Sequence, residues 1–269
     1  GEASNGFTTL SWTPSVFAVS HDVYLGTSQT DVQNATRSTT GIFKGTQTGT
    51  TYLATNLTSR YTYYWRIDET NAQGTTTKGA VWSFKPRRLA YPGAVGYGRW
   101  TLAGRYGRVI EVTNLNDSGP GSLRDALLNN TGPRVVVFRV GGVIALNSKI
   151  LIPRDNGNVY VAGQTAPGSG ICITRYSFGP YGTKDVMIRH VRLRVGDYAQ
   201  TAMDGLGLSS CDHCLIDHCS ISWCIDVAHN SLNPGNNTFT YNILSEGLYD
   251  SYHYSGTHSL AASIGGRNA

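Results

Sequence analysis

The chain has 269 residues, of which 14% are charged and 40% hydrophobic, with 32 glycines and 16 tyrosines. This composition is typical of a globular protein and excludes a disordered chain. The sequence contains no run of about 18 apolar residues, so it predicts no membrane span. The formal net charge of +5 is spread along the chain and is locally dense only at residues 86–88 and 189–194. A nucleic-acid surface would be more concentrated, so this pattern predicts no nucleic-acid partner and fits either scattered, solvated charge or contact with an acidic polymer.

Residues 1–86 contain short strands separated by polar turns. The strand patterns fall at residues 23–25, 51–53, 63–67 and 81–84. Such spacing predicts a β-sandwich of about 85 to 100 residues. His21 and Asp22 precede the first of these runs and are interpreted as turn residues. Nothing in this part predicts catalysis.

From about residue 134 the pattern changes to short alternating strands with Gly- and Asn-rich turns between them. Equivalent strands recur about every 24 to 28 residues, which predicts a solenoid. The equivalent positions are Val159, Val186, Cys214 and Thr238. The fold class is therefore all-β, with a β-sandwich at residues 1–86 and a right-handed parallel β-helix at residues 87–269.

Stacked coils predict which side chains lie above one another. One interior ladder would contain Val161, Ile188, Ile216 and Thr240, and a ladder at the bend would contain His190, His218 and Asn242. Arg189, Asp217 and Tyr241 also occupy equivalent places, so Arg189 and Asp217 would lie about one strand spacing apart, near 4.8 Å. We therefore interpret Asp217, Arg189, His218 and His190 as structural, with His218 a hydrogen-bonded interior imidazole.

All five cysteines lie in the second part: Cys172, Cys211, Cys214, Cys219 and Cys224. Cys211 and Cys214, near His213 and His218, have the residue types of a zinc site. We favour buried thiols with one disulfide, because Cys214 and Cys219 occupy apolar positions of a strand and the count is odd.

Several gapped motifs in order resemble the pectate-lyase-like polysaccharide lyases. They lie at residues 90–98, 112–126, 163–168, 216–223 and 265–269. Residues 1–86 resemble a fibronectin type III module, with Trp12 as its core tryptophan and Leu57 to Tyr63 as its tyrosine corner. The resemblance implies a secreted, extracellular protein with a parallel β-helix that is incomplete on its C-terminal side. It also implies Ca²⁺-dependent β-elimination of a uronate polymer, with an arginine as the base.

Three carboxylates are the calcium-ligand candidates that the resemblance implies. Asp204 lies in the segment 203–207 and Asp226 in the segment 222–227, and Asp197 is a weaker third candidate in the segment 195–198. Ca²⁺ prefers oxygen ligands of this kind. For each, a plain turn carboxylate is the alternative interpretation.

Departures from the family pattern leave the catalytic residues unassigned. Val227 stands where many relatives have Glu, Val95 stands where an acidic residue is common, and no Lys is present near Ser255. The segment with the catalytic Arg would follow residue 269, where the sequence given stops. Arg267 belongs to the preceding strand motif and is interpreted as structural.

Three functions stay open at this point. The chain is a polysaccharide lyase or a piece of one, a non-catalytic structural subunit whose open β-helix end builds a head-to-tail filament, or a protein that binds an acidic polysaccharide without cleaving it. Secretion would also expose five Asn-x-Ser/Thr triplets to glycosylation, at Asn34, Asn56, Asn116, Asn129 and Asn236.

Overall fold

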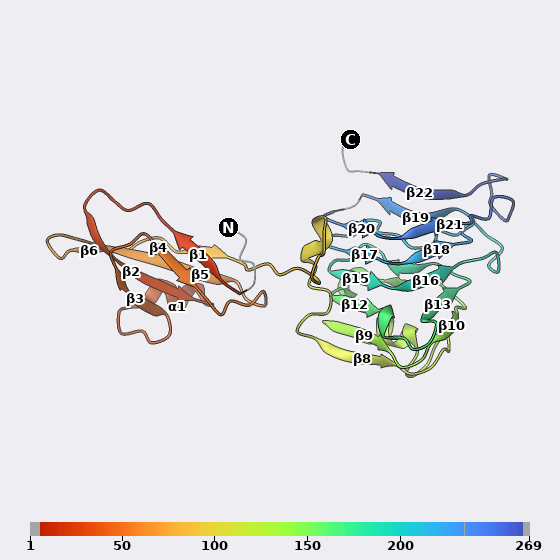
Figure 1. Cartoon of the computed structure of the whole chain (residues 1–269), viewed down its shortest axis with the longest axis horizontal. Helices are drawn as coiled ribbons and strands as arrows, with labels where there is room; N and C mark the ends of the chain where they lie inside the picture. Colours follow the sequence, from red (N-terminus) through yellow and green to blue (C-terminus); the bar gives the residue numbers. More distant parts are fainter. Residues whose placement is uncertain (1–5, 234, 266–269) are drawn as a thin grey trace. The chain divides into compact units, whose positions relative to one another are not determined.

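The computed structural model describes residues 6–233 and 235–265, and the chain divides into two compact units, residues 1–88 and 89–269 (Figure 1). Within the described ranges, no helix has both the length and the apolar character that crossing a membrane requires. Strands dominate both units, but the first unit is antiparallel and the second is parallel.

The first unit consists of two antiparallel sheets. One sheet pairs β1 (Thr8–Ser11) with β4 (Thr51–Ala54). The other has the order β3-β2-β5-β6, with β7 also paired to β5. Its strands are β2 (Ala18–Gly26), β3 (Phe43–Gln47), β5 (Tyr63–Asn71), β6 (Thr76–Thr77) and β7 (Trp82–Phe84). The strand runs expected from the sequence lie in β2, β4, β5 and β7.

The hydroxyl of Tyr63 accepts a hydrogen bond from the backbone N–H of Thr58 at 3.1 Å. This bond to a residue just upstream is the feature that defines a tyrosine corner. A short helix that the sequence did not reveal, α1 (Gln29–Asn34), begins where the Ser28 side chain accepts the N–H of Asp31. Capping by Ser satisfies one of the free N–H groups at a helix start.

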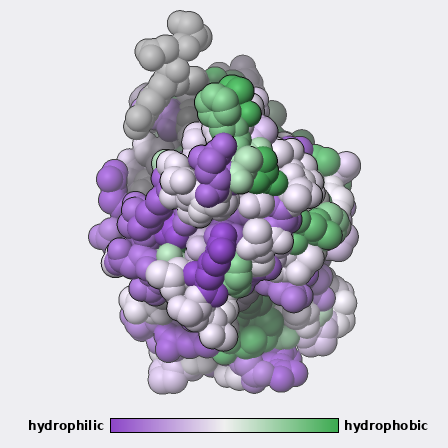
Figure 2. All heavy atoms as spheres, turned by 90° about the vertical axis from the view of Figure 1, so that its left-hand side faces the viewer, coloured by the Kyte–Doolittle hydropathy of each residue, from purple (hydrophilic) through white to green (hydrophobic). Residues whose placement is uncertain are grey.

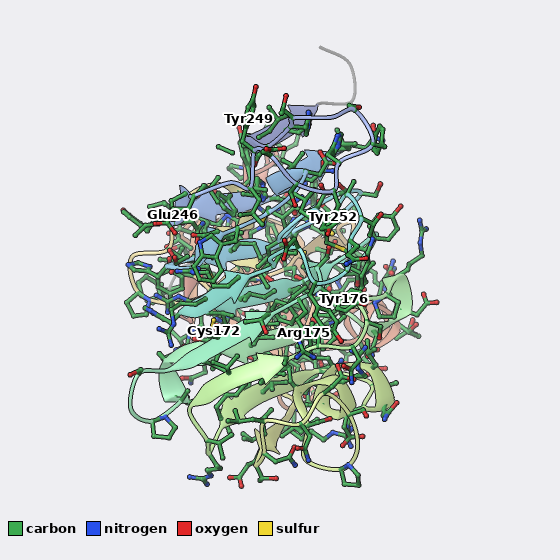
Figure 3. All side chains as sticks on the ribbon, turned by 90° about the vertical axis from the view of Figure 1, so that its right-hand side faces the viewer. Cys172, Arg175, Tyr176, Glu246, Tyr249 and Tyr252 are labelled. Atoms are coloured by element: carbon green, nitrogen blue, oxygen red, sulfur yellow. The ribbon has the colours of Figure 1, made fainter. Side chains whose placement is uncertain are left out.

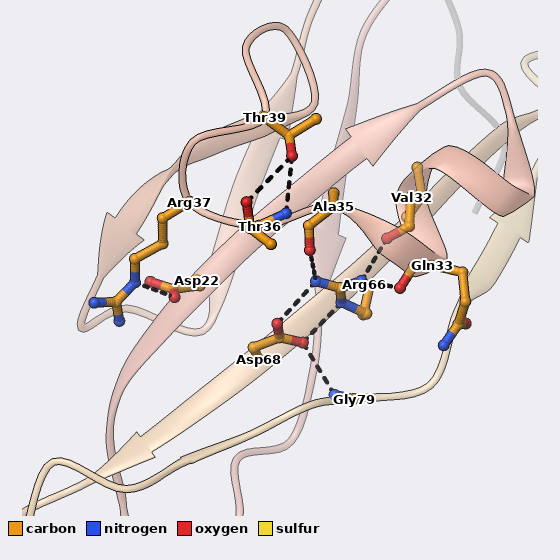
Figure 4. A network of polar contacts seen from close by, with 10 residues as sticks. All are labelled: Asp22, Val32, Gln33, Ala35, Thr36, Arg37, Thr39, Arg66, Asp68 and Gly79. Carbon is orange, nitrogen blue, oxygen red and sulfur yellow. Dashed lines mark hydrogen bonds and ion pairs between the residues drawn. The ribbon is translucent and has the colours of Figure 1, made fainter.

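A buried ion pair ties α1 to the sheet (Figure 4). Arg66 donates from Nε to Asp68 Oδ1 at 2.8 Å and from Nη2 to Asp68 Oδ2 at 2.9 Å. The same guanidinium donates to the carbonyl oxygens of Gln33 at 2.7 Å and Ala35 at 2.8 Å, at the end of α1. A buried charge needs this degree of pairing to be tolerated.

The turn assignment of His21 and Asp22 is wrong. Both residues lie inside β2 and are only 2% exposed. The strand begins at Ala18, and a carboxylate can be buried there because Arg37 donates to it from Nε at 2.6 Å. Asp22 was therefore assigned to a turn because the sequence does not show that Arg37 neutralises it inside the strand.

Trp12 is half-buried instead of filling the core of the first unit. It lines an open groove of about 590 Å³ together with Trp65 and Trp82, and its ring centroid lies 6.4 Å from that of Trp65. The face drawn in Figure 2 is mostly hydrophilic, with apolar residues scattered over it. The compact core of this unit is formed by residues such as Leu10, Leu25 and Leu57.

The second unit is a parallel β-helix, as predicted. Its first sheet stacks β8 (Arg108–Val112), β9 (Arg134–Phe138), β12 (Val159–Ala162), β15 (Val186–Arg189), β17 (Leu215–Asp217) and β20 (Thr238–Thr240). Its second sheet stacks β10 (Gly142–Ala145), β13 (Ile171–Thr174), β16 (Val191–Arg194), β18 (Ser220–Ser222) and β21 (Ile243–Ser245).

The third face pairs β11 (Ile150–Ile152) with β14 (Phe178–Pro180), and β19 (Val227–Leu232) with β22 (Leu260–Gly265). Residues 205–208 lie between these two pairs, because Gly205 and Leu208 donate their N–H groups to the carbonyls of Val227 and Asn230 at 2.8 Å. Short helical turns occupy the connections: η1 (Tyr97–Trp100), η2 (Asp125–Asn129), η3 (Arg154–Asn156) and η4 (Gly163–Thr165).

The interior ladder is confirmed for three rungs and wrong for the fourth. Val161 pairs with Ile188 and Ile188 with Ile216, but Ile216 pairs with Phe239 and not with Thr240. Thr238 likewise pairs with Leu215, one position beyond Cys214. The coil from β17 to β20 is shorter than the preceding one, which carries the long connection between β16 and β17. A uniform period therefore misplaced the last rung by one residue.

The ladder at the bend is also shifted by one position. His190, His218 and Tyr241 share a left-handed backbone with φ of 55°, 53° and 53°, and the centroids of successive rings lie 5.0 and 5.1 Å apart with the rings tilted. Asn242, expected in this row, instead accepts the N–H of Cys219 at 2.7 Å and donates to the carbonyl of Ile216 at 3.0 Å. The Asn242 amide thus joins one coil to the next.

All five cysteines are free thiols, so the expected disulfide is absent from the described residues. Burial raises the pKa of Cys219 to about 11 and that of Cys224 to about 12. His213 pairs with Asp212 at 2.8 Å and His218 pairs with Asp217 at 2.8 Å, so neither imidazole is directed to a thiol. The cysteines of this region therefore act as interior packing residues.

Candidate functional site: a groove on the third face

A groove of about 400 Å³ lies over the third face of the β-helix. Lys149, directly before β11, and Asn230, within β19, both line this groove. Asp204, which precedes β17 in the sequence, and Asp226, which directly precedes β19, line it as well. Two glycines let the coils approach here. A Cβ on Gly205 would come within 2.5 Å of the Ala228 carbonyl oxygen, and a Cβ on Gly207 within 2.6 Å of the Asn230 carbonyl oxygen.

Asp204 spans the space between two coils in this groove. Its Oδ1 accepts the N–H of Val227 at 3.3 Å, and its Oδ2 accepts the side-chain amide of Asn230 at 2.8 Å. Val227 itself is buried at the start of β19, so the oxygen ligand expected at position 227 is replaced by core packing. Both carboxylate oxygens of Asp204 therefore already support the fold.

Asp226 precedes β19 and faces two histidines from the loop between β21 and β22. Its Oδ1 lies 3.2 Å from His258 Nε2, and its Oδ2 lies 3.7 Å from His253 Nε2. The two imidazole rings stack at 4.0 Å with an interplanar angle of 15°. We call Asp226, His253 and His258 the Asp226 cluster.

The backbone holds the Asp226 cluster in place. The N–H of Asp226 donates to the carbonyl of Met203 at 3.2 Å, and its carbonyl accepts the N–H of Leu260 at 2.8 Å, two residues after His258. Neither histidine was predicted from the sequence, in which this segment differs from the family pattern by its missing Lys. The His-x₄-His spacing of residues 253–258 was the signal that could have indicated them.

Asp197 is not brought to this site. It lies in an exposed turn, where its carbonyl accepts the N–H of Gln200 at 2.9 Å, and it does not line the groove. The structure therefore places two of the three calcium candidates at the groove and leaves the third in an ordinary turn.

The donors do not fit Ca²⁺ well. Ca²⁺ takes six to eight oxygen ligands in proteins. Asp226 is flanked by imidazole nitrogens, and the Asp204 oxygens accept hydrogen bonds from Val227 and Asn230. The described residues therefore do not assemble the calcium site that the resemblance implies, and the Ca²⁺ requirement stays a prediction.

Asp217 lies in a different environment, on the first sheet. It is fully buried, and its Oδ2 accepts Arg189 Nε at 2.6 Å and His218 Nδ1 at 2.8 Å. Burial raises the pKa of its carboxyl group, but the bonds from His218 and Arg189 outweigh burial, so the pKa lies below its ordinary value. The Tyr241 equivalence was wrong, since Thr240 occupies that position and donates to Asp217 Oδ1 at 3.2 Å.

The interior position expected for His218 is wrong as well. Its side chain is 46% exposed, because the left-handed bend turns it outward while its Nδ1 still reaches Asp217. His190 is exposed beside it. The guanidinium of Arg189 lies 3.7 Å from the ring centroid of Tyr91, and burial followed by the charge of Asp217 raises the pKa of Tyr91 to about 12.

Aromatic side chains gather on the connecting loops of the second unit. Figure 3 shows Arg175, Tyr176, Tyr249 and Tyr252 on these loops. The guanidinium of Arg175 lies over Tyr198 at 4.2 Å, and Trp223 donates from Nε1 to Glu246 at 2.9 Å. Exposed aromatic rings and guanidinium groups are suited to contact a polar, ring-shaped ligand.

The remaining candidates lie on the surface or outside the described residues. All five glycosylation candidates are exposed: Asn34, Asn56, Asn116, Asn129 and Asn236. The side-chain amides of Asn129 and Asn236 donate to Asp125 at 2.9 Å and Asp212 at 3.1 Å. Arg267 lies outside the described residues.

Comparison with known proteins supports a pectate-lyase-like parallel β-helix. No family model matches the chain. The chain is 38% identical over 161 residues to a probable pectate lyase C of Aspergillus fumigatus, a match that covers 60% of this chain and 37% of that protein. It is 28% identical over 203 residues to probable pectate lyase 20 of Arabidopsis thaliana, covering 64% of this chain and 46% of that protein. The chain thus spans less than half the length of these relatives.

Among solved structures, the major allergen of cedar pollen is similar over 54% of this chain and 47% of that chain, with a TM-score of 0.47 and 18% sequence identity. A pectate lyase of Paenibacillus sp. 0602 gives a TM-score of 0.38 at 16% identity, covering 54% of this chain and 40% of that chain. At these values the structural likeness carries no argument, and the parallel β-helix rests on the strand pairing itself.

Proposed function

We propose that the chain acts on an acidic polysaccharide of the uronate type and cleaves it by β-elimination in the groove of the third face. The observation that carries this proposal is the 38% identity over 161 residues to probable pectate lyases. The groove supports it, because it combines one cation, Lys149, with the carboxylates of Asp204 and Asp226. Secretion to the extracellular space belongs to the same proposal.

The residues of the groove have separable tasks in this proposal. Lys149 is exposed, and its ammonium group pairs with a uronate carboxylate. The positive charge of Lys149 also stabilises the negative charge that develops when the C5 proton leaves. Asn230 is held by Asp204 and keeps the floor of the groove in one conformation. The base that removes the C5 proton stays unassigned among residues 6–233 and 235–265, since the resemblance implies an arginine from a later segment.

The test is the release of unsaturated product, which absorbs in the near ultraviolet, from polygalacturonate in the presence of divalent cations. A neutral glucan serves as the control polymer, because it has no carboxylate and no acidified C5 proton. Lys149→Ala should raise the KM for polygalacturonate at least about tenfold, since a charged hydrogen bond contributes about 1.5 to 3 kcal/mol. Lys184→Ala is the matched control, because Lys184 is also exposed and does not line the groove.

Retention of the protein on polygalacturonate without any product would replace cleavage by binding as the function. If the protein releases no product and is not retained on the polymer, the whole proposal is overturned. The head-to-tail filament gains no support from the described residues and stays a prediction, which sedimentation at high protein concentration would check.

We further propose that residues 1–86 form a fibronectin type III-like module and residues 87–269 the lyase-like unit. The two antiparallel sheets and the Tyr63 hydrogen bond support the first part. Limited proteolysis should cut near residues 86–88 and release two stable pieces. A single cooperative core, with no cleavage there before global unfolding, would contradict this division.

A further inference from the structure

The sheet formed by β1 and β4 in the first unit has an outer edge at β1. In the described part of the chain, β1 pairs with β4 on one side and with no strand on the other. Two strands alone are marginally stable, and a free strand edge is a template for a further strand. We propose that β1 binds an extended peptide segment of a partner protein, which adds to this edge and fills the tryptophan-lined groove beside it. The inference is independent of lyase activity, because it concerns the first unit alone.

The hydrogen bonds of β1 show which of its backbone groups point to the free edge. Trp12 donates its N–H to the carbonyl of Thr50 at 3.2 Å, so these two residues form a hydrogen-bonded pair. Hydrogen-bonded and non-hydrogen-bonded pairs alternate along antiparallel strands. Thr9 and Ser11 therefore lie in non-hydrogen-bonded pairs, and their N–H and carbonyl groups point away from β4.

These backbone groups define the chemistry of the partner. Thr9 and Ser11 are exposed, and they present a donor and an acceptor at every second residue. An extended peptide backbone offers the complementary acceptor and donor at the same spacing, which is how strand addition gains its affinity. A sugar chain could cover the indole rings of the groove, but it does not repeat this pattern of backbone groups.

The groove of about 590 Å³ in the first unit begins at the same edge. Ser11, at the end of β1, and Trp12 line it on one side, and Trp65 of β5 and Trp82 of β7 line it from the other sheet. Trp65 and Trp82 are paired in register with ring centroids 6.4 Å apart, and Trp82 is 63% exposed. Because side chains alternate along a strand, every second side chain of an added strand would enter the groove. The partner segment should therefore have apolar residues at alternate positions.

The indole of Trp12 gives a separate reason for an occupant. Its Nε1 is buried and has no hydrogen-bond partner among the described residues. A buried donor without an acceptor is destabilising. A hydroxyl or carbonyl oxygen of the entering segment can accept this N–H.

The charges of the groove favour an acidic segment. Glu69 is already engaged within the unit, because its Oε2 accepts the N–H of Ser15 at 3.1 Å and its Oε1 lies 3.4 Å from His21 Nδ1. Lys78 lines the groove and is exposed, and its ammonium group has no carboxylate partner within the part of the chain that the structure describes. An acidic side chain at one end of the partner segment would complement Lys78.

The experiment uses the full chain, isotopically labelled for NMR, and a synthetic peptide of about nine residues. In this peptide Val alternates with Thr, and a Glu stands at each end. The matched control peptide has Pro in place of the central Val, because Pro removes a donor from the ladder. The first peptide should bind at one copy per chain and slow hydrogen exchange at the amides of Thr9 and Ser11 at least about tenfold. The Pro peptide should bind at least about tenfold more weakly.

Two pairs of variants separate the edge from the groove. Thr9→Pro removes an N–H that points to the free edge and should weaken peptide binding at least about tenfold. Leu53→Pro is its matched control, because Leu53 lies opposite Thr9 and loses the N–H on the outer edge of β4 instead. Trp82→Ala should also weaken binding at least about tenfold. Tyr61→Ala removes an exposed ring outside the groove and should leave the affinity unchanged.

The proposal is overturned if the alternating peptide does not bind, if the Pro peptide binds equally well, or if Thr9→Pro binds as tightly as the wild type. Should Thr9→Pro not fold, Trp82→Ala and the amide exchange of the wild type decide. Slow exchange at Thr9 and Ser11 in the free protein that disappears on dilution would assign the edge to a second copy of the chain. Shielding of the indole rings by an oligogalacturonate, without slower exchange at these amides, would assign the groove to a sugar. Either result would overturn the peptide assignment.

Discussion

Asp217 and Asp226 lie nine positions apart in sequence, and each has a histidine within reach, yet their environments differ. Asp217 is fully buried and receives hydrogen bonds from Arg189 and His218. Asp226 is 27% exposed, meets only imidazoles and opens on the groove. The Asp217 carboxylate, neutralised by Arg189, stabilises the stacking of the coils. The Asp226 carboxylate has no arginine partner and is available to a ligand.

Asp217→Asn should have the largest effect on stability. It leaves the Arg189 charge without its partner at a position where the guanidinium is only 15% exposed. Breaking a buried pair on one side costs about 3 to 5 kcal/mol. Denaturation by urea should therefore show a loss of about 3 kcal/mol in the free energy of unfolding. A loss below about 1 kcal/mol would mean that the pair contributes as little as a surface ion pair.

The pH dependence should reveal the same pair. The folded-state pKa of Asp217 lies below the ordinary 3.8, so its stabilising effect is complete above pH 3.8 and is lost as the pH falls through the lower folded-state value. The stability difference between the wild type and Asp217→Asn should accordingly shrink in this acid range. A difference that stays constant from pH 6 to pH 2 would contradict the lowered pKa.

His218→Ala should have a smaller effect. The imidazole donates to Asp217 but is 46% exposed, and Arg189 keeps the carboxylate paired. Loss of one hydrogen bond of this type should cost about 1 kcal/mol in the free energy of unfolding. Combining His218→Ala with Arg189→Met would show whether the two side chains stabilise Asp217 independently. A coupling free energy of zero between the two changes would mean that they do not interact through the Asp217 carboxylate.

Asp226→Asn should have the smallest effect on stability. Its carboxylate has no arginine partner and lies partly in solvent, so the free energy of unfolding should change by less than about 0.5 kcal/mol. A loss as large as that of Asp217→Asn, measured in the same urea series, would show that Asp226 is a structural residue too.

The sequence predicted the solenoid because its strand recurrence needs no tertiary information. The interior rungs from Val161 to Ile216 followed from that recurrence, and the fourth failed because the final coil is shorter. His218 was misplaced because a left-handed backbone at a non-glycine residue turns the side chain outward, which periodicity does not encode.

The groove was predicted only in part. Asp204 and Asp226 were recognised from their motifs, and the structure places both at the groove. His253 and His258 were missed because they come from a loop whose approach to Asp226 depends on the pairing of β19 with β22. The His-x₄-His spacing could have marked the two histidines as a pair, but their contact with Asp226 on another coil cannot be read from local spacing.

The most direct test of the contrast between the two carboxylates is the initial rate of near-ultraviolet product formation on polygalacturonate, measured for the wild type, Asp226→Asn and His218→Ala under the same conditions. Removal of the Asp226 carboxylate should lower the rate, because Asp226 lines the groove in which we propose that the polymer is cleaved, while His218→Ala should keep the wild-type rate. Wild-type activity in Asp226→Asn would contradict the account.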